Sequence, residues 1–214
     1  MNNNILSYKS EILKQYDREA HIYVDRRPWM RTYILYRIIN FIQSLLKDNE
    51  IILSIGCGPG WLERLLADMH EFVSIDVSHE MVKVAAKCPK IHALVADGEH
   101  LSFRPGSFDV IIASRVIKFI DLNSFMKEIK DTLKIGGLVI ALFDCGDAFW
   151  VKLLEGIGVP VDVGIYNKTL RTQQLLRIMK RHSLNFVKEY PHYSNATIAL
   201  CPYPSFYDKV CPKA

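Results

Sequence analysis

The chain has 214 residues, of which 50% are hydrophobic and 23% are charged, and this balance excludes intrinsic disorder, a collagen, a coiled coil and a disulfide scaffold. The net charge of +4 permits an anionic partner without arguing for one. The sequence has no apolar run of signal-peptide or membrane-span length, and its 5 scattered cysteines form no CxxC pair. We therefore expect a cytoplasmic protein with reduced thiols and no metal site.

Residues 1–48 are predicted to be helical. A helix is expected over Ser7–Tyr23, and Pro28 precedes a second helix over Met30–Lys47. In the second helix, apolar side chains recur every three or four residues, which is the spacing of an amphipathic helix. We expect this region to form part of a lid over the core that follows it.

Residues 49–143 alternate short apolar runs with amphipathic segments. The runs predict strands at Ile51–Ile55, Glu71–Asp76, Ile91–Ala96, Phe108–Ala113 and Leu138–Phe143. The segments between them predict helices at Trp61–Leu66, His79–Cys88 and Leu122–Leu133. This alternation is typical of a parallel sheet covered by helices on both faces.

Residues 144–214 follow a different pattern. The irregular segment Asp144–Tyr166 is a second candidate for the lid, and a helix is expected over Thr169–Arg181. Phe186–Tyr190 and Ala196–Leu200 are separated so briefly that they must pair as an antiparallel hairpin. The fold class predicted is α/β: one Rossmann-like domain with a seven-stranded, mostly parallel sheet, ending in an antiparallel C-terminal hairpin.

A glycine-rich loop, Gly56-Cys57-Gly58-Pro59-Gly60, lies between the first predicted strand and the next helix. Glycines at such a place let the backbone turn tightly and approach a ligand closely. Ligands of open α/β sheets bind at this carboxyl edge of the strands. An ordinary tight turn would have the same composition, so the loop alone is a weak signal.

Acidic residues follow the next two predicted strands. Asp76 ends one of them, where a carboxylate can accept hydrogen bonds from both hydroxyls of a ribose. Asp97 follows the other, where a carboxylate or its neighbouring backbone can bind the amine of an adenine. The alternative for Asp76 is a helix cap or loop residue, and Ser78 competes for the cap. Together with the glycine loop, these strand ends predict a nucleoside-binding site.

In this order and spacing, the motifs resemble those of class I S-adenosylmethionine-dependent methyltransferases of the small-molecule type that includes quinone-biosynthesis enzymes. The resemblance covers residues 51–143, including the Lys134–Gly137 turn before the fifth strand. It implies S-adenosylmethionine as cofactor. It also implies a set of cofactor-binding residues: the loop residues Gly56, Cys57, Gly58 and Gly60; the ribose ligand Asp76; Val77 and Met81 beside the adenine; Asp97, Gly98 and Glu99 at the adenine amine; and Ser114 near the methyl group.

The sequence departs from the family pattern at Ser54. The family usually has Asp or Glu two residues before the first glycine, near the amino group of the cofactor. A serine hydroxyl accepts a hydrogen bond but carries no charge, so about 1 kcal/mol or more of cofactor affinity could be lost. Either other groups compensate for the missing charge or the cofactor binds weakly.

The resemblance fixes no catalytic residue, because methyl transfer depends mainly on alignment of the acceptor and exclusion of water. Candidates are Arg115 after the fourth strand and Tyr16 and Tyr23 in the N-terminal segment. A surface ion pair for Arg115 and a packed helix face for the tyrosines are equally open. Residues 113–116 lack the Asn/Asp-Pro-Pro-aromatic motif of nucleic-acid amino-methylating enzymes, so we expect a small, hydrophobic metabolite as acceptor rather than nucleic acid.

Two other functions remain open. A non-catalytic cofactor-binding or regulatory protein could keep this fold, and Ser54 is the observation that favours it. An NAD(P)-dependent oxidoreductase would share the glycine loop and the strand-end acid. Its usual G-x-G-x-x-G spacing would place glycine at position 61, where this chain has Trp61.

Overall fold

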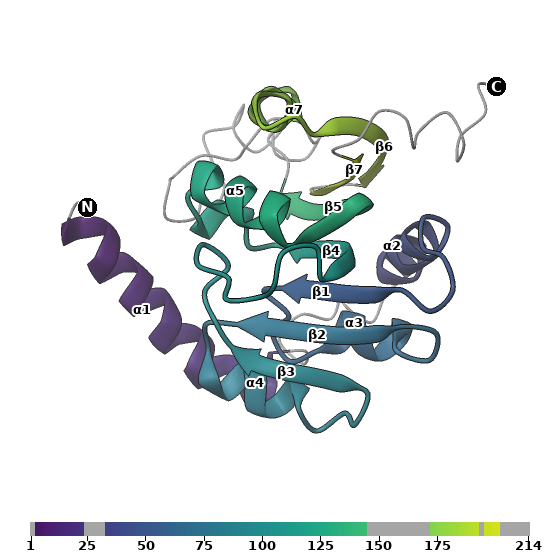
Figure 1. Ribbon diagram of the computed structural model, residues 1–214. Coiled ribbons are helices and arrows are strands. Elements are labelled where there is room, and N and C mark those ends of the chain that lie inside the picture. Colours follow the sequence, from purple (N-terminus) through teal and green to yellow (C-terminus); the bar gives the residue numbers. More distant parts are fainter. Residues whose placement is uncertain (1–2, 24–32, 145–171, 193–194, 202–214) are drawn as a thin grey trace. The chain divides into compact units, whose positions relative to one another are not determined.

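The computed structural model describes residues 3–23, 33–144, 172–192 and 195–201. The chain divides into two compact units, Met1–Gly98 and Glu99–Ala214. Each unit is built on hydrogen-bonded strands (Figure 1). The predicted lid segment Asp144–Tyr166 lies outside the described residues except for Asp144 itself.

The first unit contains three parallel strands in the order β3-β2-β1. They are β1 (Ile51–Ile55), β2 (Glu71–Asp76) and β3 (Ile91–Val95). Ser54 of β1 lies opposite Ser74 of β2, which lies opposite Ala93 of β3. β1 and β2 have the predicted bounds, and β3 ends one residue earlier than predicted. Parallel pairing places the carboxyl ends of all three strands at one edge.

Helices of the first unit are α1 (Asn3–Glu19), η1 (Ala20–Ile22), α2 (Tyr33–Gln43), α3 (Trp61–Leu66) and α4 (His79–Ala85). α4 packs on β2 and β3, and α1 runs beside α4 (Figure 1). Two helices are shorter than predicted, because their last turns tighten. The N–H of Leu45 donates to Ile42 O, and that of Cys88 to Ala85 O, which are three-residue turns rather than α-helical bonds.

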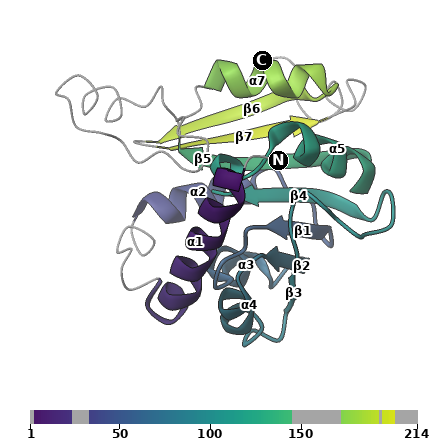
Figure 2. The same cartoon turned by 90° about the vertical axis from the view of Figure 1, so that its left-hand side faces the viewer.

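The second unit contains the parallel pair β4 (Phe108–Ser114) and β5 (Leu133–Asp144), and β5 also pairs with the antiparallel strand β7 (Asn195–Cys201). β7 in turn pairs antiparallel with β6 (Asn185–His192). The helices are η3 (Ile117–Phe119), α5 (Leu122–Thr132) and α7 (Thr172–Arg181). α7 lies along β6 (Figure 2).

The predicted start of β5 is wrong. The strand begins at Leu133 rather than Leu138, and the predicted Lys134–Gly137 turn is an irregularity within it, opposite Asp109. Gly136 has a φ of 79°, and a Cβ on Gly137 would lie 2.8 Å from the Asp109 carbonyl oxygen. Lys134 Nζ is 2.8 Å from the Asp109 carboxylate. These contacts with a distant strand hold the segment in the sheet.

The core of each unit consists of its strands and the apolar faces of the helices against them. Ile52, Leu53 and Ile55 of β1 are buried, as are residues 110–113 of β4. The prediction of an α/β Rossmann-like fold with a parallel sheet is confirmed. No helix within the described ranges is both long and apolar enough to cross a membrane.

Candidate functional site

The glycine loop leaves β1 at its carboxyl end and is held against β2. The N–H groups of Gly56 and Cys57 both donate to Ile75 O, at 2.9 and 3.1 Å. The N–H of Gly60 donates to Cys57 O at 3.0 Å, which closes a tight turn before α3. Gly56, Gly58 and Gly60 have φ values of 73°, 54° and 73°, a region that L side chains rarely adopt.

The loop glycines meet different surroundings. A Cβ placed on Gly60 would lie 3.1 Å from both Ala85 Cβ and Ile91 Cδ1, so packing against α4 and β3 requires a glycine there. A Cβ placed on Gly58 would have no atom within 4 Å. Gly58 therefore faces open space, and its bare backbone is accessible to a ligand.

The carboxylate of Asp76 bridges the loops that follow β1 and β2. Its Oδ2 accepts a hydrogen bond from Gly58 N and its Oδ1 accepts one from Ser78 N, both at 2.9 Å. Burial raises the pKa of Asp76, and backbone N–H groups, including those of Ser78 and Gly58, oppose this increase. Each carboxylate oxygen retains a lone pair that these bonds do not use.

The exit of β3 lies beside that of β2, because Ala96 N donates to Asp76 O at 3.1 Å. Asp97 and Gly98 follow directly. Val77 is 50% exposed, as expected of a residue that lines a binding surface, whereas Met81 is buried in the first turns of α4. The structure thus brings the glycine loop, Asp76, Val77 and Asp97 to one edge of the sheet.

Ser54 and a residue that sequence reasoning missed, Glu63, form a fully buried pair. Ser54 Oγ donates to Glu63 Oε1 at 2.5 Å, and both side chains are 0% exposed. Burial raises the pKa of Glu63 to about 7, although the Ser54 hydrogen bond lowers it. Glu63 interrupts a buried helix face formed by Leu62 and Leu66, and this interruption was the available signal.

Cys57, between the first two glycines of the loop, has a buried, free thiol. Burial raises the pKa of Cys57 well above its ordinary value, and the carboxylates of Glu63 and Asp76 raise it further. The thiol therefore stays protonated at neutral pH, which makes it a poor nucleophile and metal ligand.

The N-terminal segment contacts the same edge. Asp17, on α1, accepts a hydrogen bond from Ser78 Oγ at 2.5 Å, and Ser78 Oγ also caps α4 by accepting one from Met81 N. The rings of the predicted candidates Tyr16 and Tyr23 lie 6.0 Å apart. α1 is thus anchored next to the residue that follows Asp76 and Val77.

The second unit contains the other predicted residues. Glu99 is buried, and its Oε1 accepts a hydrogen bond from Asp121 N at 3.1 Å. Ser114 is the last residue of β4. Arg115 has a φ of 59°, which is unusual for a non-glycine residue, and its N–H donates to Leu142 O at 2.8 Å. Residues held in such rare backbone conformations cluster at functional sites.

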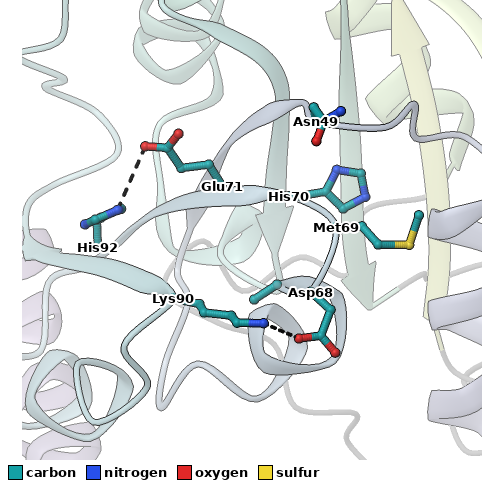
Figure 3. A pocket seen from close by; sticks show the side chains of 8 residues that line it. Asn49, Asp68, Met69, His70, Glu71, Lys90 and His92 are labelled. Carbon is teal, nitrogen blue, oxygen red and sulfur yellow. Dashed lines mark hydrogen bonds and ion pairs between the residues drawn. The ribbon is translucent and has the colours of Figure 1, made fainter.

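A separate hollow of about 390 Å³ lies where β2 and β3 begin, at the opposite end of these strands (Figure 3). Its ionisable side chains lie in pairs: Lys90 with Asp68, and His92 with Glu71 at 3.9 Å. Both pairs are largely exposed to solvent. None of the predicted site residues lines this hollow.

Comparison with known proteins agrees with the geometry. The family model for a methyltransferase domain matches residues 53–141. The chain is 32% identical to an uncharacterized protein of Methanocaldococcus jannaschii, over 71% of this chain and 57% of that protein. It is 30% identical to the malonyl-[acyl-carrier protein] O-methyltransferase of Dechloromonas aromatica, over 76% of this chain and 60% of that enzyme. It thus spans little more than half the length of these relatives.

Among solved structures, the fold matches a SAM-dependent methyltransferase, a possible histamine N-methyltransferase, from Thermotoga maritima. The TM-score is 0.67 at 18% identity, over 86% of this chain and 98% of that one. Residues 53–141 thus match the methyltransferase-domain family, and the chain has the fold of the S-adenosylmethionine-dependent methyltransferases. S-adenosylmethionine is the cofactor of this family, and the matched residues include the glycine loop, Asp76 and Asp97.

Proposed function

We propose that the chain catalyses methyl transfer from S-adenosylmethionine to a small-molecule acceptor, and that the cofactor binds at the carboxyl edge of β1, β2 and β3. The observation that carries the proposal is the Asp76 carboxylate, which two backbone N–H groups hold beside the open face of Gly58. A ribose binds where a fixed hydrogen-bond acceptor for its hydroxyl groups lies next to accessible backbone.

The residues present fit this cofactor. Asp76 would accept hydrogen bonds from the ribose hydroxyls, and the exposed Val77 would contact the adenine. Asp97 and Gly98, which follow β3, would bind the adenine amine. Glu99 and Ser114 belong to the same predicted set, and Met81 would support the adenine side from within the core. When bound, the cofactor supplies a methyl group on a cationic sulfur, which makes that methyl group electrophilic.

The protein's own contribution is to orient the acceptor and to exclude water. Arg115, held in an unusual backbone conformation after β4, is the candidate for orienting an anionic acceptor. Tyr16 and Tyr23, near the anchored end of α1, are candidates for covering the site. A carboxylate acceptor needs no base, whereas an ammonium or a phenol must lose a proton before its nitrogen or oxygen can attack the methyl group.

The relatives suggest which acceptors to try first. A malonyl thioester offers a carboxylate oxygen, by analogy with the Dechloromonas aromatica enzyme, and histamine offers an amine, by analogy with the Thermotoga maritima protein. These two acceptors differ in charge and in the atom methylated. Transfer to one and not the other would define the class of substrate.

The finer predictions belong to the same proposal. It includes one methyltransferase domain with seven strands, an antiparallel C-terminal hairpin, helices on both faces, and a lid formed by residues 1–48 and residues 144–166. The antiparallel pairing of β6 with β7 supports the hairpin. A cytoplasmic location is also proposed, and the free thiols of Cys57 and Cys88 support it.

The test is isothermal titration of the purified protein with S-adenosylmethionine and S-adenosylhomocysteine, followed by methyl-transfer assays with the two acceptors. Micromolar binding and transfer to either acceptor is the expected result. Binding with no transfer to any acceptor in a wider screen would favour the non-catalytic alternative. Binding of NADH without binding of S-adenosylmethionine would favour the oxidoreductase.

A further inference from the structure

Glu63 is an unusual residue for the interior of a protein. It is the third residue of α3, and its side chain is 0% exposed between the buried Leu62 and Leu66. Glutamate is almost never fully buried unless it is paired. A buried carboxyl group at this place therefore calls for a partner.

Within the described residues, one of the two carboxyl oxygens of Glu63 has a hydrogen-bond partner and the other has none. Glu63 Oε1 accepts the hydrogen bond from Ser54, but Glu63 Oε2 is buried with no hydrogen-bond partner. No salt bridge to Glu63 occurs within the described ranges of the chain. An unsatisfied buried oxygen is costly, and it commonly marks the place of a missing water, ion or ligand.

The groups around Glu63 are predominantly acidic. Cys57 of the glycine loop and Asp76 of β2 both interact with it electrostatically, and neither provides a positive charge. Arg64, its neighbour on α3, is the cation that acts on it, but the Arg64 guanidinium is exposed and donates to Val84 O at 2.7 Å. A positively charged donor that reached Glu63 Oε2 would satisfy both the hydrogen bond and the charge.

We propose that Glu63 binds the α-ammonium group of the cofactor's methionine part, and that Ser54 positions Glu63 for this contact. The inference rests on the proposed function. The ammonium group carries three N–H donors, whereas the sulfonium carries none, so of the two cationic groups of the cofactor the ammonium is the one that can donate to Oε2. Glu63 is bonded to Ser54 of β1 and Asp76 ends the neighbouring strand β2, so the two carboxylates would hold different parts of one ligand.

This contact couples cofactor binding to a proton. Burial holds the pKa of Glu63 at about 7 in the free protein, so a large share of Glu63 is protonated at neutral pH. An ammonium group beside it favours the ionised form, so binding releases this proton. Affinity should therefore rise with pH up to the pKa of the free protein and level off above it. Asp76 also titrates with a raised pKa, so the Glu63 share must be isolated with a variant.

The experiment compares three ligands by isothermal titration: S-adenosylmethionine, S-adenosylhomocysteine and 5′-methylthioadenosine, which keeps the nucleoside and lacks the amino-acid part. Glu63→Gln is expected to weaken the first two by about 10- to 100-fold, as a lost charge-assisted hydrogen bond does. It should leave 5′-methylthioadenosine within about twofold of the wild type. Ser74→Ala is the matched control, because Ser74 is also a fully buried polar residue and lies on the neighbouring strand. This variant should change none of the three affinities.

A swap variant tests whether the carboxylate itself, rather than its place on α3, is needed to bind the ammonium group. Ser54→Asp combined with Glu63→Ser moves the carboxylate from α3 to β1, and it should restore S-adenosylhomocysteine binding to within about threefold of the wild type, since one charged group again serves the ammonium. Thermal unfolding of every variant establishes that it is folded.

The pH dependence of binding is compared between the wild type and Glu63→Gln. S-adenosylhomocysteine affinity should rise about tenfold between about pH 6 and about pH 8, which is the factor expected for one group that titrates near 7. The profile of Glu63→Gln should be flatter by that factor. An equal loss for all three ligands, no loss for any, or identical pH profiles of wild type and variant would overturn the inference. If the wild type binds none of the ligands, the proposed function fails first and the inference fails with it.

Discussion

The two ends of the strands in the first unit differ in how their polar side chains are held. At their amino ends lies the hollow of about 390 Å³, where exposed side chains pair with one another. At their carboxyl ends, buried or backbone-anchored groups converge: Asp76 on two N–H groups, Ser78 on Asp17, and Glu63 with one free oxygen.

The comparison shows that shape alone does not define a site. Charges that pair with each other in water contribute little and leave nothing for a ligand. Polar groups that are held in place before a ligand arrives cost no reordering when it binds. Variants at both ends of the strands test whether function is confined to the carboxyl edge.

The largest effect is expected at Gly58. A Gly58→Val side chain would enter the open space beside Asp76, so S-adenosylhomocysteine affinity should fall by at least about 100-fold in isothermal titration. The φ of +54° should also cost about 1–2 kcal/mol of stability, because valine rarely adopts it.

Gly106→Val is the matched control for that strain. Gly106 has a φ of +63°, and a Cβ on it also meets nothing within 4 Å. The two variants should lose similar stability in chemical denaturation, while only Gly58→Val loses cofactor binding. Normal binding by a folded Gly58→Val protein would mean that the cofactor site is elsewhere.

Asp76→Ala should have the next largest effect. Removal of the carboxylate deletes the ribose acceptor, so affinity for S-adenosylmethionine should fall by about 1–3 kcal/mol. Gly58 N and Ser78 N also lose their acceptor, so the free energy of unfolding should fall as well. 5′-Methylthioadenosine keeps the ribose and should lose the same factor, which distinguishes this variant from Glu63→Gln. An unchanged affinity would contradict the assignment of Asp76 to the ribose.

Ser78→Ala tests the anchor of α1 and should have a smaller effect, mainly on stability. The hydroxyl caps α4 and donates to Asp17, so its removal should cost about 1–2 kcal/mol in urea denaturation. Asp121→Ala, which removes the cap of α5, is the comparison, and its loss should be nearer 1 kcal/mol because its carboxylate accepts a capping hydrogen bond from Ser124 N and, among the described residues, does not also anchor a second helix. A smaller loss of stability in Ser78→Ala than in Asp121→Ala would mean that the hydrogen bond between Ser78 and Asp17 does not stabilise the fold.

Much of this edge could be predicted from the sequence, because local patterns determine it. Short apolar runs gave the bounds of β1 and β2, and the position of Asp76 at a strand end follows from those bounds. The three loop glycines looked equivalent in sequence. The structure separates Gly60, which close packing requires, from Gly58, which faces open space, since that distinction depends on α4 and β3.

The features that sequence reasoning missed depend on distant contacts. The early start of β5 reflects the fit of Gly137 against Asp109, which lies on another strand. The partner of Ser54 lies nine residues later, on a helix, so the departure from the family pattern looked like a lost charge. Glu63 provides a carboxyl group beside Ser54, and a glutamate on an otherwise apolar helix face was the clue.

The smallest effect is expected at the amino ends of the strands. Asp68→Ala and Lys90→Ala each break a solvent-exposed ion pair, so S-adenosylhomocysteine affinity should stay within about twofold of the wild type. Isothermal titration of both variants beside Asp76→Ala compares the two ends directly. A loss of cofactor affinity in Asp68→Ala comparable to that in Asp76→Ala would place the binding site in the hollow, because no described contact links Asp68 to the glycine loop. Unchanged affinity in both variants would leave the anchored groups at the carboxyl edge as the determinants of binding.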